Sequence, residues 1–585
     1  MHLSVGLTAK AWGVLPLFAL TLTASGSYAA PPTASDAPAP ADRVAATSEQ
    51  ELSPIEYYRQ RTRAVEMFER GQYKESLPLF RALTTFFEKD GENWWMLARC
   101  QSATKDYAAA IASYKRAIDL GFGERSEHAH QVAGLYSKLG EDELAFEWLE
   151  RSLAAPLEDR RSLYRDLRVR ELEPAERVRD VVGLLPKREF TRDEGWRYDL
   201  AFFAKEAERM HHSPWRKTSR EDFHAAVQKL HERIPDLSDA QIVVELQKLA
   251  VLLADGHSGV SLGSKRTAFT PFPLAMFRFT DGLFVIDAGE PYKELIGSRV
   301  VSIGGVDSDE VFVRLRDVVS HDNLMGVDWL GPRFLRVPAV LENLGLAEDP
   351  SKLELRMAAA DGSERDVVVE PAPFRLSRRL IPSQLEGAGP PPLHLKKVDK
   401  TFWFEHFPEH EAVYVQFNQV ANDPDESIEA FALRLQRFLV AYPDVQNLIM
   451  DVRHNSGGNT YLTIPLLRTL IFFETSREGR LFTIIGRNTF SACQNFATEI
   501  DRLTNSVLVG EPTGSSPNSI GESTNVQLPY SRVGAGISTR NWQTSWPRDR
   551  RKWIAPDVPT ELSSADYFAN RDPAFAAIME LIAAE

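Results

Sequence analysis

Short apolar segments alternate with helical segments in the last third of the chain, and this alternation constrains the fold more than any other feature. The apolar segments are VYVQFNQV, NLIMDVR, LFTIIG and SVLVGE. Strands that alternate with helices predict a largely parallel sheet with helices on its faces. NLIMDVR, the helical segment after it and LFTIIG form one strand–helix–strand unit, and LFTIIG begins the next. We therefore expect an α/β core over residues 401–585.

Two turns of this predicted core carry residues that are suited to acyl transfer. Gly457 and Gly458 follow one strand in DVRHNSGGN, where backbone N–H groups can converge on an anion. Ser491 follows the next strand in NTFSACQN, and with Gln494 it forms the pattern of a capping box. Both turns lie at the carboxyl edge of a parallel sheet, so the Ala492 N–H and a glycine N–H are predicted to flank the oxygen of a tetrahedral intermediate. We expect Ser491 to cap its helix at rest and to attack a carbonyl from the same position.

The motifs of these turns resemble those of a known family. Asp-Val-Arg-x-Asn-x-Gly-Gly, then Thr-Phe-Ser-Ala-x-x-x-Phe-Ala, then GEPTG are similar to the signature of the C-terminal-processing (tail-specific) serine peptidases. The resemblance covers residues 192–575. It implies a crotonase/Clp-protease-like core sandwich with a helical cap and a PDZ-like β insert, and it implies that Ser491 is the nucleophile. The bacterial branch of this family uses a Lys base, but no Lys lies between Ser491 and Lys552.

A His base is implied by the other branch of the family, which the tricorn protease core typifies. LLADGHSGV resembles its Leu-x-Asp-Gly-His-Ser/Thr motif, which makes His257 the base. A neutral imidazole is suited to taking the serine proton near pH 7 and returning it to the leaving amine. His454, inside the Gly-Gly loop, is the alternative base. Cys493 is an alternative nucleophile, which its position inside the helix disfavours.

The acid that orients His257 has several candidates. In the tricorn-like pattern an acid precedes a Pro-Asp pair by several residues, which points to Asp549, with Glu522 next. The other two candidates are Glu511 and Asp557. The Arg- and Trp-rich segment RNWQTSWPRDRRKW around Asp549 is interpreted either as a solvated loop or as a site for a substrate's terminal carboxylate.

An internal repeat occupies residues 55–170. Ser76, Ala110 and Ala145 recur at spacings of 34 and 35 residues. A large residue follows each of them by four positions: Phe80, Tyr114 and Leu149. A small residue that faces a large one lets two helices pack closely, and the period resembles that of tetratricopeptide repeats. Such repeats form concave surfaces, so this region is interpreted as a binding site for a protein partner or as a rigid spacer.

Three segments separate the repeats from the α/β core. Residues 192–250 are helical in pattern and lead into ADGHSGVSL, so 190–266 form the predicted helical cap. Residues 268–371 have the order strand, Gly turn, strand, Gly-Gly turn, helix and closing hairpin, which resembles a PDZ-like module. Residues 372–400 contain GAGPPP and are predicted to be a linker.

The N-terminus is typical of an exported protein. Residues 1–30 contain a Lys, then an apolar run, then small residues that offer a cleavage site, as in a signal peptide. The apolar run of about 13 residues is too short to span a bilayer comfortably. Residues 31–54 are rich in Pro, Ala and Ser and are predicted to be a disordered linker. We therefore expect a periplasmic or secreted protein with no stable membrane insertion after cleavage.

Composition limits the other classes of function. A net charge of −14 argues against non-specific binding to nucleic acid, which requires basic surface. Cys100 and Cys493 fall in different predicted domains, so no disulfide is expected. The chain has no His-Glu-x-x-His motif, and neither a metal nor another cofactor is expected.

The sequence thus predicts an exported serine peptidase that hydrolyses peptides or proteins through an acyl-enzyme. The alternative is a non-catalytic protein that binds peptides or lipids, because the interphotoreceptor retinoid-binding proteins use the fold implied by the resemblance to carry lipids. A carrier has no need to keep both a serine and a histidine, so the pair of Ser491 and His257 favours the peptidase.

Overall fold

The computed structural model describes residues 53–122, 125–152, 179, 185–263, 269–377 and 380–584. The predicted signal peptide at 1–30, the predicted linker at 31–54 except for its last two residues, and the end of the repeat region after residue 152 lie outside the described residues. Within the described ranges, no helix combines the length and the apolar character that crossing a membrane requires.

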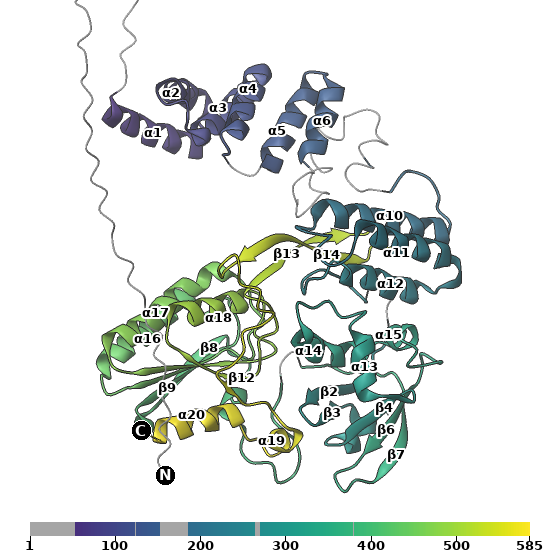
Figure 1. The fold of residues 1–585 in the computed structure, drawn as a ribbon. Coiled ribbons are helices and arrows are strands. Elements are labelled where there is room, and N and C mark those ends of the chain that lie inside the picture. The colour runs from purple at the N-terminus through teal and green to yellow at the C-terminus, as the bar shows by residue number, and fades with distance from the viewer. Residues whose placement is uncertain are drawn as a thin grey trace, which may run out of the picture. The chain divides into compact units, whose positions relative to one another are not determined.

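The repeat region consists of helices that pack each against the next (Figure 1). These helices are α1 (Pro54–Glu69), α2 (Tyr73–Phe86), α3 (Gly91–Ala103), α4 (Tyr107–Asp119), α5 (Arg125–Lys138) and α6 (Asp142–Ser152). The small residues Ser76, Ala110 and Ala145 are fully buried. The large residues four positions later are each at most 2% exposed. Close helix packing at this period is what the repeat predicted, and the helical repeats are confirmed.

The helical cap follows and packs on a small antiparallel sheet. Its helices are α10 (Arg192–Met210), α11 (Arg220–Arg233) with the 3-10 turn η1 (Ile234–Asp236), and α12 (Asp239–Val251). The sheet has the order β1 (Gly259–Val260), β14 (Gly534–Gln543), β13 (Asn518–Gln527). The hairpin of β13 and β14 comes from the C-terminal part of the chain, and its apolar side joins the core of the cap. Asp199 of α10 fixes the hairpin, because its carboxylate accepts from the N–H groups of Tyr530 and Ser531, both at 2.7 Å.

An antiparallel sheet with three α-helices and one 3-10 helix forms the insert. Its strands run in the order β2 (Leu274–Phe279), β3 (Gly282–Ala288), β4 (Arg299–Ile303), β6 (Leu353–Ala358), β7 (Glu364–Val369), and β5 (Val306–Asp307) pairs with β4. Its helices are η2 (Glu290–Leu295), α13 (Ser308–Leu315), α14 (Leu324–Phe334) and α15 (Pro338–Asn343). The hairpin that joins β6 to β7 turns at Gly362, which has a φ of +83° that favours glycine.

The α/β core is built on a six-stranded sheet with the order β15-β12-β11-β10-β9-β8. Its strands are β8 (Phe402–Phe407), β9 (Ala412–Phe417), β10 (Asn447–Asp451), β11 (Arg480–Ile485), β12 (Val507–Gly510) and β15 (Val558–Pro559). Pairing is parallel from β9 to β15, and only β8 is antiparallel to its neighbour. The parallel α/β core that the alternating pattern predicts is therefore confirmed.

Helices cover both faces of this sheet (Figure 1). Val413, Leu448 and Leu481 pack on one face, against helices α16 (Ile428–Ala441), α17 (Ile464–Ser476) and α18 (Ala492–Leu503). Tyr414 and Ile449 point to the other face, against α20 (Pro573–Ala583). The remaining short helices of the core region are η3 (Leu393–Leu395), η4 (Pro408–His410), η5 (Thr460–Thr463) and α19 (Ser564–Phe568). Burial on both faces explains why these strands are almost uninterruptedly apolar.

Candidate active site

Ser491 occupies a strained turn between β11 and α18. Its backbone has a φ of +54° and a ψ of −126°, which is rare for a residue other than glycine. The Ser491 side chain forms no capping hydrogen bond, so the predicted capping box with Gln494 is wrong. The strained backbone belongs to the residue that the sequence analysis predicts as the nucleophile. Backbone strain of this kind is common at functional sites.

The Gly-Gly loop after β10 lies directly against this turn. A Cβ added to Gly457 would lie 2.7 Å from the Ser491 Cβ, and one added to Gly458 would lie 2.0 Å from the Val420 carbonyl oxygen. Both glycines also have positive φ, +106° and +145°. The loop is held by Val420, whose N–H donates to the Gly457 carbonyl at 3.0 Å. Only glycines allow the loop to approach both Val420 and Ser491.

Two backbone N–H groups beside the Ser491 turn have no acceptor among the described residues. The Gly457 N–H donates to Asn455 Oδ1 at 2.9 Å, so it is not available to bind an oxyanion, contrary to one of the predicted options. In the described part of the chain, the N–H groups of Gly458 and Ala492 meet no acceptor. Ala492 is the first residue of α18, where unpaired N–H groups and the helix dipole favour negative charge.

A buried carboxylate holds the loop that carries His257. The Asp255 Oδ1 accepts from the N–H groups of His257 and Ser258, both at 2.7 Å, and from the Ser538 hydroxyl at 2.6 Å. Its Oδ2 lies 2.9 Å from His211 Nε2. Burial opposes the charged form of Asp255, but hydrogen bonds from His211, Ser538 and Ser258 hold its pKa well below the usual value. The backbone of His257 is therefore fixed by a permanent anion.

The imidazole of His257 packs beside the nucleophile turn. Its ring stacks on that of Phe490, the residue before Ser491, with a distance of 4.4 Å between ring centroids and an interplanar angle of 24°. On β13, a Cβ added to Gly521 would lie 3.2 Å from the imidazole, so a larger residue there would require the ring to shift. The His257 Nδ1 is enclosed and has no partner among the described residues, and no hydrogen bond joins His257 to Ser491 within them. The cap thus brings its histidine to the serine turn, with the Phe490 ring as the contact.

Asp322 is a buried acid beside the His257 loop that the sequence analysis did not consider. It lies between α13 and α14 of the insert, and its Oδ1 accepts from the N–H of Gly256, the residue before His257, at 3.0 Å. Its Oδ2 accepts from the Ser515 hydroxyl, in the loop after β12. Burial raises the pKa of Asp322, and the nearby His257 charge acts in the opposite direction. The sequence analysis considered only acids that follow Ser491, whereas Asp322 reaches the site through tertiary packing alone.

The predicted acid, Asp549, forms its hydrogen bonds with residues of its own loop. Its Oδ2 accepts from the Ser545 hydroxyl at 2.6 Å and from Arg551 Nη2 at 2.8 Å. These hydrogen bonds, led by that of Arg551, lower the pKa of Asp549 to about 2. No hydrogen bond joins Asp549 to His257 in the described residues. The physical reason is that a nearby arginine, in its own loop, takes both carboxylate oxygens.

The alternative acids are also engaged elsewhere or exposed. Glu511 is paired with Arg487 at 2.6 Å, and Asp557 accepts from the Leu508 N–H at 2.9 Å. Glu522 is exposed and has a φ of +59°. None of these carboxylates is placed as Asp322 is, against the residue that precedes His257.

The alternative base and the alternative nucleophile are both buried. His454 Nε2 lies 2.7 Å from His394 Nδ1, in a pair that is almost fully enclosed. Burial raises the pKa of the Cys493 thiol well above its usual value, which keeps the thiol protonated. Neither residue is therefore suited to the reaction. Within the described ranges, no group of three or more His, Cys, Asp or Glu side chains is placed to hold a metal ion.

The His394–His454 pair predicts an acid-sensitive stability. Burial, followed by the Arg453 charge, lowers the pKa of His394 to about 4 from its ordinary value of 6.5, while Asp572 and Asp451 act in the opposite direction. Between these two pH values the unfolded chain binds a proton that the folded chain does not, so stability falls as the pH falls. At pH 5 we expect a loss of about 2 kcal/mol relative to pH 7.5 from His394 alone.

Thermal melts at both pH values check this prediction with His394→Asn as the comparison, since Asn keeps a polar atom near the position of Nδ1. Although burial acts in the opposite direction, the Arg453 charge holds the pKa of Asp572 below its usual value, and this effect acts only below this window. We expect the decrease in Tm between pH 7.5 and pH 5 to be smaller in the variant. An equal decrease in both proteins would contradict the assignment.

Known proteins resemble this chain in its repeat sequence and in its fold. The tetratricopeptide repeat family matches residues 91–120, and no curated protein is significantly similar to the chain. Among solved structures, the chain is similar to mature CPAF complexed with lactacystin, at 12% identity and a TM-score of 0.44 over 67% of this chain and 97% of that chain. It is also similar to the photosystem II D1 C-terminal processing protease, at 15% identity and a TM-score of 0.32 over 66% of this chain and 99% of that chain.

The tricorn protease is a third structural neighbour, at 14% identity and a TM-score of 0.32 over 68% of this chain and 38% of that chain. The structural neighbours of the chain thus include the processing and tricorn proteases whose motifs its sequence resembles.

Proposed function

We propose that this chain is a serine peptidase that hydrolyses peptide bonds through an acyl-enzyme, with Ser491 as the nucleophile and His257 as the general base. One observation carries the proposal. Three segments that are far apart in the sequence meet at one point: the strained Ser491 turn, the Gly-Gly loop pressed against it, and the His257 loop stacked on Phe490. A plain helix cap requires neither the glycines nor the histidine.

The chemistry follows from these positions. The Ser491 hydroxyl attacks the carbonyl carbon of the scissile bond while the His257 imidazole takes its proton. The carbonyl oxygen becomes an oxyanion, which accepts hydrogen bonds from the Gly458 and Ala492 N–H groups. The C–N bond then breaks as His257 returns the proton to the leaving amine. Water attacks the resulting ester by the same steps, which releases the acid product and restores Ser491.

Asp322 is the positioning residue for His257 in this proposal. Its carboxylate holds the Gly256 N–H and so fixes the peptide that leads into His257. Its charge also favours the imidazolium that forms when His257 takes the serine proton. The insert therefore takes part in catalysis by supplying the residue that fixes the base of the cap.

Asp322→Asn is expected to lower kcat by about 10²-fold with a smaller change in KM, because the change removes a charge that stabilises only the protonated base. Asn retains an oxygen that can accept from the Gly256 N–H, so the loop should keep its place. Asp549→Asn is the matched comparison, and it should leave kcat within a few-fold of the wild type. Steady-state hydrolysis of a fluorogenic peptide measures both. A larger loss in Asp549→Asn than in Asp322→Asn would restore the original assignment.

The proposal also covers the substrate, the localisation and the partner of the protein. Proteins or peptides are the proposed substrates, processed in the periplasm or outside the cell after export by the signal predicted at residues 1–30. The repeat region is proposed to bind a protein partner. We retain 190–266 as the cap, 268–371 as the insert, 372–400 as a linker and 401–585 as the catalytic core.

A fluorophosphonate probe distinguishes a peptidase from a carrier on the same fold. Such probes react with activated serines, because the general base that serves catalysis also serves the reaction with the probe. We expect one adduct per chain, mapped to Ser491 by mass spectrometry, and no adduct in Ser491→Ala. Absence of labelling in the folded wild-type chain would favour a non-catalytic binding protein.

A further inference from the structure

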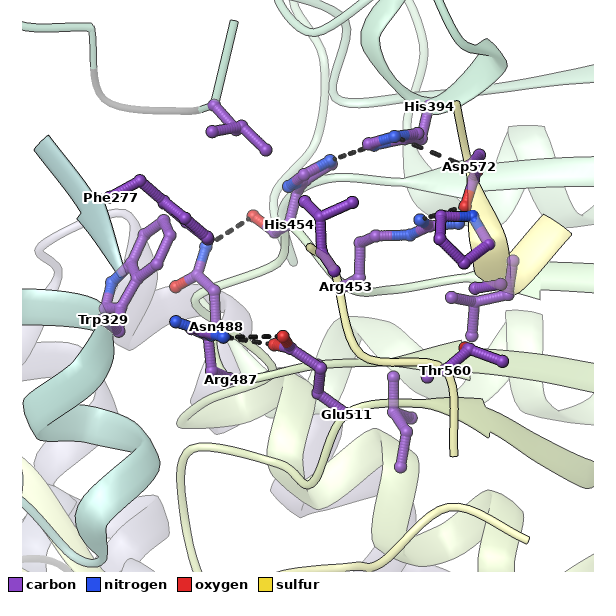
Figure 2. Close-up of a pocket in the computed structure, with 18 residues that line it drawn as sticks. Phe277, Trp329, His394, Arg453, His454, Arg487, Asn488, Glu511, Thr560 and Asp572 are labelled. Atoms are coloured by element: carbon purple, nitrogen blue, oxygen red, sulfur yellow. Dashed lines mark hydrogen bonds and ion pairs between the residues drawn. The ribbon is translucent and has the colours of Figure 1, made fainter. Parts of the chain in front are cut away.

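A cavity lies at the carboxyl edge of the core sheet, and neither Ser491 nor His257 lines it (Figure 2). The cavity has a volume of about 70 Å³, and its walls include Phe277 and Trp329 of the insert and Asn488 of the loop before Ser491. Its floor includes residues of α20, which covers the face of the sheet opposite to α18. A molecule in this cavity therefore lies behind the nucleophile loop, away from a peptide bound at Ser491.

The charged groups in the cavity wall are paired with one another. Arg487 is bound by both oxygens of Glu511, at 2.6 and 2.8 Å, and Arg453 by both oxygens of Asp572, at 2.8 and 3.0 Å. Figure 2 shows both pairs among the residues that line the cavity. Because each cation is already neutralised by a carboxylate, the cavity is suited to an uncharged ligand and not to an anion.

An unsatisfied acceptor is built into the wall. Asn488 is only 4% exposed, and its Nδ2 donates to the His454 carbonyl at 3.0 Å, which fixes the orientation of the amide. The Asn488 Oδ1 is enclosed and meets no donor among the described residues, and the same is true of the Thr560 Oγ1. Both residues line the cavity. Enclosed polar atoms without partners are rare in native proteins, and they are satisfied when a ligand or water supplies the missing group.

The size and walls of the cavity define the ligand further. A volume of about 70 Å³ accommodates about five water molecules, which corresponds to one small ring. The ring of Phe277 is covered on one side by the Arg487 guanidinium, 4.9 Å from its centroid, and Trp329 adds a second flat surface. Such walls favour a planar ligand over a branched one.

We propose that this cavity binds a small, uncharged, planar molecule that carries an N–H or O–H donor. The donor binds the Asn488 Oδ1, and the ring packs between the aromatic walls. The site is separate from the proposed peptidase reaction and does not depend on it. The Asn488 amide also donates to the His454 carbonyl of the Gly-Gly loop. A ligand bound to Asn488 would therefore stabilise the contact between the Gly-Gly loop and the loop before Ser491.

Pyrazole and 1-methylpyrazole form a matched pair of probes, because both are uncharged planar rings at neutral pH and only pyrazole has an N–H. Isothermal titration of the full chain should show saturable binding of one pyrazole, with an affinity at least tenfold higher than that of 1-methylpyrazole. Equal affinities, or no saturable binding of pyrazole to the wild-type chain, would overturn the proposal.

Two variants locate the bound probe. Asn488→Leu removes the acceptor, and Ala574→Leu fills the cavity from α20 without touching the amide. Each should weaken pyrazole binding at least tenfold, whereas Ser491→Ala should bind pyrazole as the wild type does. Unchanged binding in a folded Ala574→Leu chain would place the probe elsewhere and overturn the proposal. If neither variant folds, the comparison of the two probes on the wild-type chain decides alone.

Discussion

Ser491→Ala is expected to lower kcat/KM for peptide hydrolysis by about 10⁴-fold or more, the loss typical of removing the nucleophile from a serine hydrolase. The loss should lie almost entirely in kcat, because the hydroxyl forms no hydrogen bond that holds the turn or the helix. For the same reason the Tm should change little. Hydrolysis of a fluorogenic peptide, together with a thermal melt, measures both quantities.

Ser476→Ala provides the control for this variant. Ser476 lies at the end of α17, and among the described residues its hydroxyl donates to the Phe473 carbonyl alone, at 3.3 Å. This substitution should leave kcat/KM unchanged. Equal hydrolysis by the wild type and Ser491→Ala would show that the strained turn has another purpose.

His257→Gln is expected to lower kcat/KM by about 10³- to 10⁴-fold, because glutamine retains hydrogen-bonding atoms but cannot accept and return a proton. The Phe490 contact and the Asp255 hydrogen bonds to the backbone should persist, so the chain should stay folded. The double variant with Ser491→Ala should be no less active than either single variant, since the two residues act as one unit.

His454→Gln tests the alternative base in the same assay. His454 belongs to the buried pair with His394 and lines the cavity proposed to bind a planar ligand. Its replacement should alter kcat/KM far less than His257→Gln does. A larger loss in His454→Gln would mean that the base had been assigned to the wrong loop.

The fold was predictable where local patterns repeat. The alternation of apolar strands and helices indicated the parallel core, and a small residue facing a large one every 34 or 35 positions indicated the helical repeats. The β13–β14 hairpin was not predicted, although it completes the sheet under the cap. Its strands contain Gly521, Gly534 and Gly536 and many polar residues, so they lack the apolar alternation by which strands are recognised.

The candidate site was predictable in its residue types but not in its backbone. Sequence motifs placed Ser491, His257 and the Gly-Gly loop together, and the structure brings these segments into contact. A positive φ at Ser491 cannot be read from a capping pattern, so the predicted cap was wrong. The contact of the proposed acid Asp322 with Gly256 could not be predicted, because it joins two domains and no local spacing records such a contact.

The role of His257 as the base of Ser491 is tested most directly by the structure of the full chain after reaction with a peptide boronic acid. We predict a tetrahedral boron bound to the Ser491 Oγ, with one boron oxygen accepting from the N–H groups of Gly458 and Ala492. The His257 imidazole should lie within hydrogen-bond reach of the adduct, at about 3 Å. An adduct on another residue, or a His257 imidazole that stays about 10 Å or more from Ser491, would contradict the proposed mechanism.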